Sequence, residues 1–174
     1  MEGEKESITL TSGDGEDFLV DKSVAMKLGL VKGLMEDLAT EVKVPVPNVT
    51  SWELRFILNY CDDSSNEEEQ QPPAEEEDER AAKAKKDRDA EFVDGLKNSQ
   101  LPYLIMAANY LNVAGLLELL IVTTADRIKN RSVEYVRRLF GIENDFTEEE
   151  EEKLRKENEW AYHDVDPDDD IDEI

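Results

Sequence analysis

A segment without a single charged residue, residues 101–117, constrains the fold of this chain more than any other stretch. Its apolar side chains recur at helical spacing and fall on one face: Leu101, Leu104, Ile105, Ala108 and Leu111. Such a stripe is typical of a helix that packs against a hydrophobic core. We therefore predict that this helix lies at the centre of the fold and leads into a second helix.

The same helix carries a second uncharged face. Tyr103, Met106 and Tyr110 fall opposite the apolar stripe, and Asn109 lies at its margin. Solvation alone does not explain aromatic and thioether side chains at such positions, so this face needs a neighbour. Either another layer of the same domain covers it or a partner protein does, and the sequence leaves both alternatives open.

The charge of the chain limits its partners. Its 44 acidic residues against 20 basic ones give a net charge of −24, whereas contacts with phosphates need a basic patch. We therefore expect protein partners, with no binding of nucleic acid or of an anionic membrane.

Compartment and membrane topology also follow from the sequence. Cys61 is the single cysteine and permits no internal disulfide, and the first residues lack the apolar core of a signal peptide. We expect a reducing compartment, the cytoplasm and the nucleus. The apolar run of residues 116–122 is too short to span a bilayer and is predicted to be a core helix.

The N-terminal part predicts a small sheet. Residues 8–12 and 17–20 read as two strands around the turn Gly13-Asp-Gly15, because Asp-Gly tolerates the positive φ of a hairpin turn. Residues 42–47 contain two prolines and are predicted to form an edge strand. Strands followed by helices indicate an α+β fold.

Helix signals follow in the same region. Residues 24–38 show helical spacing, and Gly29 and Gly33 are expected to split them into two short helices. Thr50 and Glu53 form a capping box that predicts a helix start.

That helix is predicted to end near Cys61, which occupies its apolar stripe as a small buried hydrophobe. Residues 62–90 show no apolar periodicity and are rich in Glu, Gln, Ser and Pro, so we expect an acidic disordered loop.

The C-terminal part is built from caps and charge pairs. Ser132 is predicted to cap a short helix that Gly141 ends, and Thr147 with Glu150 forms a second capping box. Three acid-to-base pairs at i, i+4 support the helix that follows: Glu149/Lys153, Glu151/Arg155 and Glu152/Lys156. The acidic tail, residues 163–174, is expected to be disordered.

Several motifs carry a family resemblance: Ala-Ala-Asn109-Tyr110-Leu, Gly115-Leu-Leu, Asn144-Asp-Phe-Thr-Glu-Glu-Glu-Glu151 and Arg155-Lys-Glu-Asn-Glu-Trp160. The chain resembles the S-phase kinase-associated protein 1 family, the adaptors of SCF ubiquitin ligases, from Ile8 to Trp160. The resemblance implies a BTB/POZ domain over residues 1–131 and F-box-binding helices over residues 132–162. A cullin would bind the BTB/POZ part.

The resemblance also implies site residues. The cullin-facing residues would be Asn109, Tyr110, Tyr103 and Met106. The F-box-binding residues would be Leu101, Pro102, Ile105, Leu117, Thr124, Ile128, Ile142, Asn158 and Trp160. The free chain would be able to form a homodimer through the surface of the BTB/POZ part that binds the F-box.

Four positions depart from the family pattern. Arg88 stands where the family usually has Trp, Pro102 where it has Phe, Thr124 where it has Val, and Val133 where it has Pro. The chain therefore resembles a diverged paralogue, and the changes at Pro102 and Thr124 bear on its choice of F-box receptors. Without proline at position 133, prolyl hydroxylation is excluded there.

No pattern for catalysis or for a cofactor is present. The single histidine, His163, lies in the acidic tail, and there is no glycine-rich phosphate loop and no Cys/His spacing for zinc. We expect a non-enzymatic protein, with at most weak binding of a divalent metal at His163, Asp164 and Asp166.

Two other interpretations remain open. An acidic chaperone that binds basic proteins fits the net charge, but it does not account for the uncharged face of residues 103–110 or for Trp160. An elongin-C-like adaptor fits the BTB/POZ part but not the helices beyond Arg131.

Overall fold

The computed structural model describes residues 7–37, 43–68, 77–163 and 165–168, and it contains two compact units. The sheet unit comprises Met1–Gly95 and Tyr103–Leu120, and the C-terminal unit comprises Leu96–Pro102 and Ile121–Ile174. The division passes through the helices α5 (Leu101–Tyr110) and α6 (Ala114–Ile128), not between residues 131 and 132.

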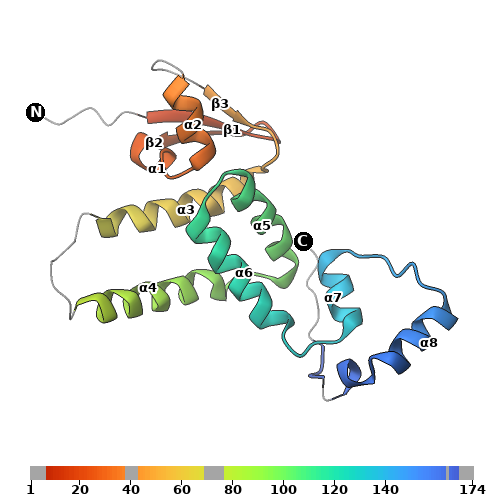
Figure 1. Cartoon of the computed structure of the whole chain (residues 1–174). Coiled ribbons are helices and arrows are strands. Elements are labelled where there is room, and N and C mark those ends of the chain that lie inside the picture. The colour runs from red at the N-terminus through yellow and green to blue at the C-terminus, as the bar shows by residue number, and fades with distance from the viewer. Residues whose placement is uncertain (1–6, 38–42, 69–76, 164, 169–174) are drawn as a thin grey trace, which may run out of the picture. The chain divides into compact units, whose positions relative to one another are not determined.

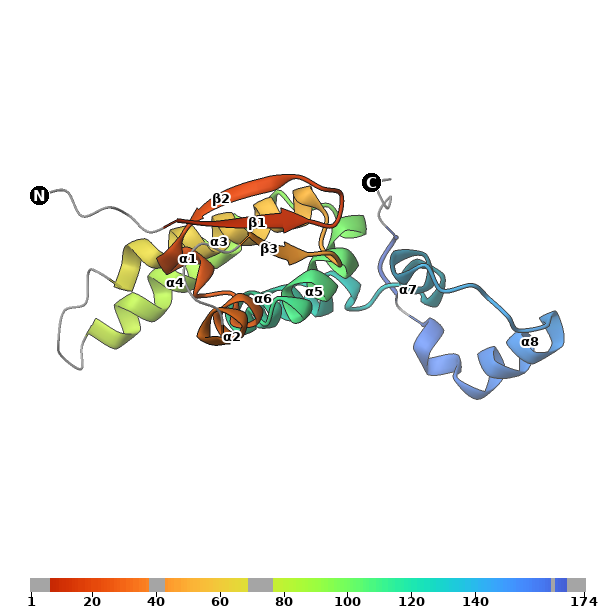
Figure 2. The same ribbon diagram turned by 90° about the horizontal axis from the view of Figure 1, so that it is seen from above.

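Three strands form the sheet in the order β2-β1-β3 (Figure 1). β1 (Ser7–Ser12) pairs antiparallel with β2 (Asp17–Asp21), and Gly15 in the turn has φ +88°, which confirms the predicted hairpin. β3 (Lys43–Val46) runs parallel to β1 at the edge of the sheet, as predicted. Ile8, Leu10 and Val20 are buried whereas Leu19 is exposed, so the helices cover one face of the sheet (Figure 2).

The two short helices predicted after the hairpin are α1 (Lys22–Ala25) and α2 (Gly29–Asp37). α2 begins at Gly29, where a side chain has no room, since a Cβ there would lie 2.5 Å from the Asn112 amide nitrogen. The predicted break at Gly33 is wrong, since Gly33 lies inside α2 on its exposed side, where water tolerates the missing side chain.

The start of α3 (Ser51–Glu68) follows the predicted signal and has an additional support. The Glu53 carboxylate accepts the Thr50 backbone N–H at 2.7 Å. The Asp14 carboxylate, from the hairpin turn, accepts both the backbone N–H and the hydroxyl of Ser51 at 2.9 and 2.6 Å. The hairpin and α3 are therefore joined at the helix N-terminus, which favours negative charge.

The acidic loop predicted over residues 62–90 is wrong over most of its length. α3 continues to Glu68, and α4 (Glu77–Asp94) begins after residues 69–76, which lie outside the described residues. Residues 77–90 are rich in Ala, Glu, Lys and Arg, all strong helix formers. The Phe92 ring then contacts Phe56 and Tyr60 on α3, with centroids 4.6 and 5.4 Å apart, so α4 has an aromatic anchor.

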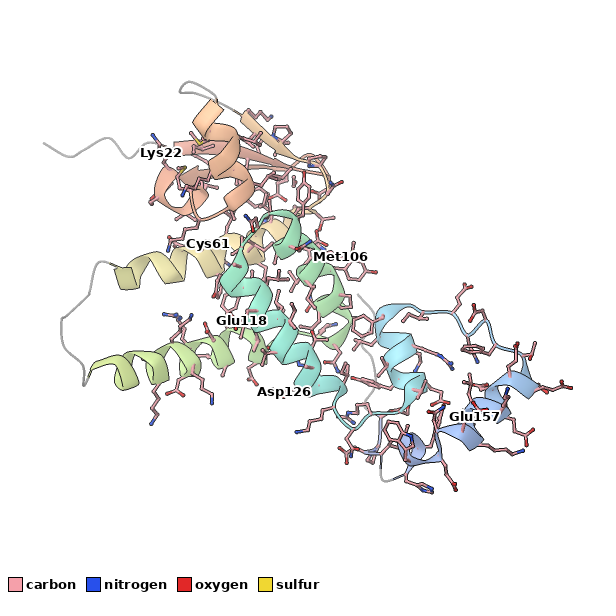
Figure 3. The ribbon with its side chains drawn as sticks, in the orientation of Figure 1. Lys22, Cys61, Met106, Glu118, Asp126 and Glu157 are labelled. Carbon is pink, nitrogen blue, oxygen red and sulfur yellow. The ribbon has the colours of Figure 1, made fainter. Side chains whose placement is uncertain are left out.

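Burial of apolar side chains from several helices forms the core of the sheet unit. Cys61 of α3 is buried, which confirms its predicted packing role (Figure 3). Burial raises the pKa of its thiol to about 11. Further buried side chains come from α3, α5, α6 and the turn between α5 and α6: Leu54, Ile57, Leu104, Ala108, Leu111, Leu116 and Leu120.

The C-terminal unit contains η1 (Asn98–Gln100), the second half of α6, α7 (Val133–Phe140), α8 (Glu148–Glu157) and η2 (Glu159–Tyr162). Tyr135 is fully buried, and its hydroxyl accepts a hydrogen bond from the Asn98 side chain at 2.8 Å. The Arg127 guanidinium donates to the Asn98 side chain at 2.9 Å and to the Leu96 carbonyl at 2.5 Å. This polar network ties η1 to α6 and α7.

The predicted caps of α7 are confirmed. Ser132 accepts the Tyr135 N–H at 2.9 Å, and Gly141 adopts φ +65°, which lets the Ile142 N–H reach the Arg137 carbonyl at 2.8 Å.

The capping box of Thr147 and Glu150 at the start of α8 is also confirmed. Two of the predicted pairs along α8 form, Glu151/Arg155 and Glu152/Lys156, whereas Lys153 lies 3.9 Å from Glu157 on the next turn.

The prediction of a disordered tail is wrong for residues 165–168, which contact residues 130–132 of the C-terminal unit. Asp164 and residues 169–174 lie outside the described residues. Within the described part of the chain, no helix is long and apolar enough to cross a membrane.

Candidate partner-binding surfaces

The second uncharged face of α5 is exposed. Met106 points away from the other helices of the sheet unit (Figure 3). The exposed fraction is 71% for Met106 and 50% for Tyr103, Asn109 is exposed, and Tyr110 is half-buried. Among the described residues, no other layer of the sheet unit covers Tyr103 or Met106. We call these four residues the α5 face.

The core stripe of α5 agrees with the sequence at four of its five positions. Leu101, Leu104, Ala108 and Leu111 are buried, but Ile105 is half-buried and Ala107 is buried. The buried side is therefore turned toward Ala107, which leaves part of Ile105 accessible.

The residues predicted to bind an F-box differ in exposure and in location. Ile142 and Trp160 are 57% and 78% exposed. The half-buried members are Pro102, Ile105, Leu117, Ile128 and Asn158, of which Ile105 and Leu117 belong to the sheet unit and the rest to the C-terminal unit.

Leu101 and Thr124 are buried within the chain itself. In this conformation neither side chain is accessible to a partner. Both are placed to support the surface around them, because a buried side chain fixes the backbone of the helix that presents its exposed neighbours.

Sequence reasoning missed a group of exposed apolar side chains in the C-terminal unit: Ile121, Val122, Phe140 and Phe146. A signal for two of them was present. Leu119-Leu120-Ile121-Val122 are consecutive on a helix, and four consecutive residues span more than one face, so they cannot all point into one core.

Ion pairs join α8 to α7. Arg137 lies 3.1 Å from Glu151, and its hydrogen bond, more than its charge, holds the pKa of the Glu151 carboxyl below its ordinary value. Arg155 pairs with Glu134 and lies over the Tyr162 ring at 4.9 Å. No side chain of α8 is fully buried, and Leu154, its apolar residue, is half-buried, so polar contacts supply much of the attachment of this helix.

The described residues contain no group of three or more His, Cys, Asp or Glu side chains that could hold a metal ion. His163 lies 3.4 Å from Glu159, and the weak site considered at His163 includes Asp164, which lies outside the described residues.

Comparison with known proteins covers both units. Residues 6–66 match the family model described as Skp1 family, tetramerisation domain, and residues 114–161 match the Skp1 family, dimerisation domain. The chain is 55% identical to SKP1-like protein 15 of Arabidopsis thaliana over 89% of this chain and 91% of that protein. It is 45% identical to SKP1-like protein 1 of Oryza sativa subsp. japonica over 92% and 98% of the two chains.

These matches agree with the architecture, in which a small three-stranded sheet with helices is followed by a helical C-terminal unit. They also agree with the resemblance carried by the motifs around Asn109 and Trp160. The two family models and the long alignments together show that this chain belongs to the Skp1 family.

Proposed function

We propose that this protein is a non-catalytic adaptor of an SCF-type cullin-RING ubiquitin ligase, which bridges a cullin to F-box substrate receptors for ubiquitin-dependent degradation. Family membership supports this role. The observation that carries it is the exposure of uncharged side chains on two separate elements, the α5 face and the C-terminal unit, in a chain of net charge −24. An adaptor needs two such surfaces, one for each partner.

The α5 face is the proposed cullin-binding surface. Aromatic and methionine side chains are enriched in the centres of protein interfaces, and Tyr103 and Met106 follow one another on the same side of a rigid, well-packed helix. Such preorganised residues lose little conformational freedom on binding. Asn109 and the half-buried Tyr110 extend the surface along the helix.

The C-terminal unit is the proposed F-box-binding surface. Ile142 and Trp160 are exposed there, together with the apolar group formed by Ile121, Val122, Phe140 and Phe146. Because α8 is attached largely by ion pairs and buries no side chain fully, a partner that covers it would add apolar burial. We expect the amides of α8 to exchange quickly in the free protein and to become protected when an F-box protein is added.

A paired binding experiment tests both halves of this proposal. Tyr103→Ala with Met106→Ala should weaken cullin binding by about 2 kcal/mol, roughly thirtyfold, and leave F-box binding unchanged. Ile142→Ala with Trp160→Ala should do the reverse. Leu19→Ala is the matched control, since Leu19 is 78% exposed on β2 and belongs to neither surface, and it should change neither affinity.

Loss of both partners in a variant that keeps its melting temperature, or of neither, would contradict the assignment of separate surfaces. The salt dependence of partner binding distinguishes the adaptor role from that of an acidic chaperone. Binding through apolar surfaces should persist at high ionic strength, whereas the affinity of a polyanion for basic proteins should collapse.

We also propose that the protein works in the cytoplasm and the nucleus. Its one thiol, Cys61, is buried and protonated at neutral pH. A free thiol is the form expected in a reducing compartment. Imaging of the tagged protein in cells tests this directly.

A further inference from the structure

A short stretch of the acidic tail contacts the start of α7 within the C-terminal unit. The Asp166 backbone N–H donates to the Asn130 carbonyl at 2.8 Å, and the Arg131 guanidinium donates to the Pro167 carbonyl. The extended backbone of the tail is therefore paired with the loop that precedes α7.

The Asp168 carboxylate makes the next contact. It accepts the Ser132 backbone N–H at 3.2 Å and the Ser132 hydroxyl at 2.5 Å, and one of its oxygens lies 3.5 Å from the Arg138 guanidinium. The Ser132 hydrogen bond is the largest of the effects that lower the pKa of the Asp168 carboxyl. The carboxylate thus sits at the positive end of α7, where negative charge is favoured.

The residues that the tail contacts are held in place by the buried Tyr135. The Arg131 guanidinium lies 5.5 Å from the centre of the Tyr135 ring, and Tyr135 is fully buried and hydrogen-bonded to Asn98. Ser132 is held as the N-cap of α7 by the Tyr135 N–H. The tail residues 165–168 are exposed, so a preorganised surface holds a loosely attached segment.

We propose that Asn130, Arg131, Ser132 and Arg138 form a binding site for an extended acidic peptide, and that residues 165–168 fill it as an intramolecular ligand. The partner it fits is an acidic segment of another protein that places a carboxylate where Asp168 lies. We call these four residues the α7 acidic-peptide site. This proposal goes beyond the adaptor role and does not depend on it.

The tail is suited to be displaced. Exposed ion pairs contribute little individually, so its advantage over an outside peptide comes from covalent attachment, which supplies an effective concentration on the order of millimolar. While the tail is bound, an outside segment binds with an affinity reduced by the fraction of chains in which the site is open. The tail therefore raises the concentration of the outside segment that is needed to occupy the site.

The test uses the full-length protein and a labelled synthetic peptide with the sequence of residues 163–174, followed by fluorescence anisotropy at low salt. Asp168→Asn in the protein removes the carboxylate that holds the tail and should tighten peptide binding about five- to tenfold. Asp166→Asn is the matched control. It removes the same charge two residues away, but Asp166 contacts the site through its backbone N–H, so the affinity should remain close to that of the unchanged protein.

Two further variants locate the peptide. Adding Arg138→Ala to the Asp168→Asn protein should remove most of the gained affinity, and a peptide that itself carries Asp168→Asn should bind at least fivefold more weakly than the unaltered peptide. Helix content by circular dichroism should be the same in all variants, because the Ser132 cap remains. Equal affinities for the Asp166→Asn and Asp168→Asn proteins, or a gain that Arg138→Ala does not reduce, would overturn the proposal.

Discussion

The sheet unit and the C-terminal unit are both largely helical, yet different interactions stabilise them. In the sheet unit, aliphatic side chains from α3, α5 and α6 are buried together with one face of the sheet. In the C-terminal unit, Tyr135 and Leu139 are the large buried residues of α7, and α8 buries none. Burial of apolar area contributes more to stability than exposed ion pairs, so the difference predicts one stable unit and one that depends on a partner.

The helices α3 and α8 show the contrast most directly, because both begin with a Thr-x-x-Glu sequence. At α3 the cap is flanked by buried Val49 and Leu54. At α8 the same cap is followed by Glu and Lys residues in water. A cap decides where a helix begins, whereas packing decides how firmly the helix is held.

The largest expected effect on stability comes from truncating a buried leucine in the sheet unit rather than a half-buried one on α8. Leu116→Ala in the core of the sheet unit should lower the free energy of unfolding by about 2–5 kcal/mol, since it leaves a cavity among buried side chains. Leu154→Ala on α8, where Leu154 is only half-buried, should cost much less. Urea unfolding of both variants checks this, and equal losses would contradict the proposed difference between the units.

A glycine pair tests backbone conformation in the two units. Gly141→Ala places a side chain at φ +65° and should destabilise the end of α7 by about 1–2 kcal/mol. Gly33→Ala, inside α2, should stabilise by about 0.5–1 kcal/mol. Neither added Cβ meets an atom within 4 Å, so backbone conformation alone distinguishes them. Thermal melts should shift in opposite directions, and shifts of the same sign would contradict this account.

Removing the cap of α8 should have a smaller effect. Thr147→Ala removes the acceptor for the Glu150 N–H and should cost about 1 kcal/mol, seen as lost helix content because little packing holds α8. Thr147→Ser keeps the acceptor and is the control. If circular dichroism does not distinguish the two variants, α8 is held by contacts other than its cap.

Acid should loosen α8 through two carboxyls. The Thr147 backbone N–H lowers the pKa of Glu150, and the Arg137 hydrogen bond lowers that of Glu151, both from an ordinary value of 4.5. A lowered pKa in the folded state means that the stabilisation is present above the unfolded value and is lost as pH falls through the folded one. Helix content from α8 should therefore decrease below about pH 4.5. Glu151→Gln should reduce the part of that change that depends on Arg137, and an unchanged titration would contradict the role of this pair.

Much of the local structure follows from the sequence alone. The hairpin turn at Gly15, the start of α3, the cap at Ser132, the stop at Gly141 and the box at Thr147 were all predicted. Each depends on hydrogen bonds or backbone angles within a few residues. Helical spacing likewise predicted which side of α5 is buried and placed Tyr103 and Met106 opposite it.

The tertiary structure decided what no short window of sequence contains. It turned the buried side of α5 toward Ala107 and buried Leu101 and Thr124. It also packed Phe92 of α4 against α3, although composition indicated disorder over residues 62–90, which include most of α4. It also joined Asp168 to Ser132, residues separated by 36 positions. Hydrophobic spacing and caps are properties of neighbouring residues, whereas exposure and long-range pairing depend on which distant surfaces meet, and that is fixed only when the whole chain packs.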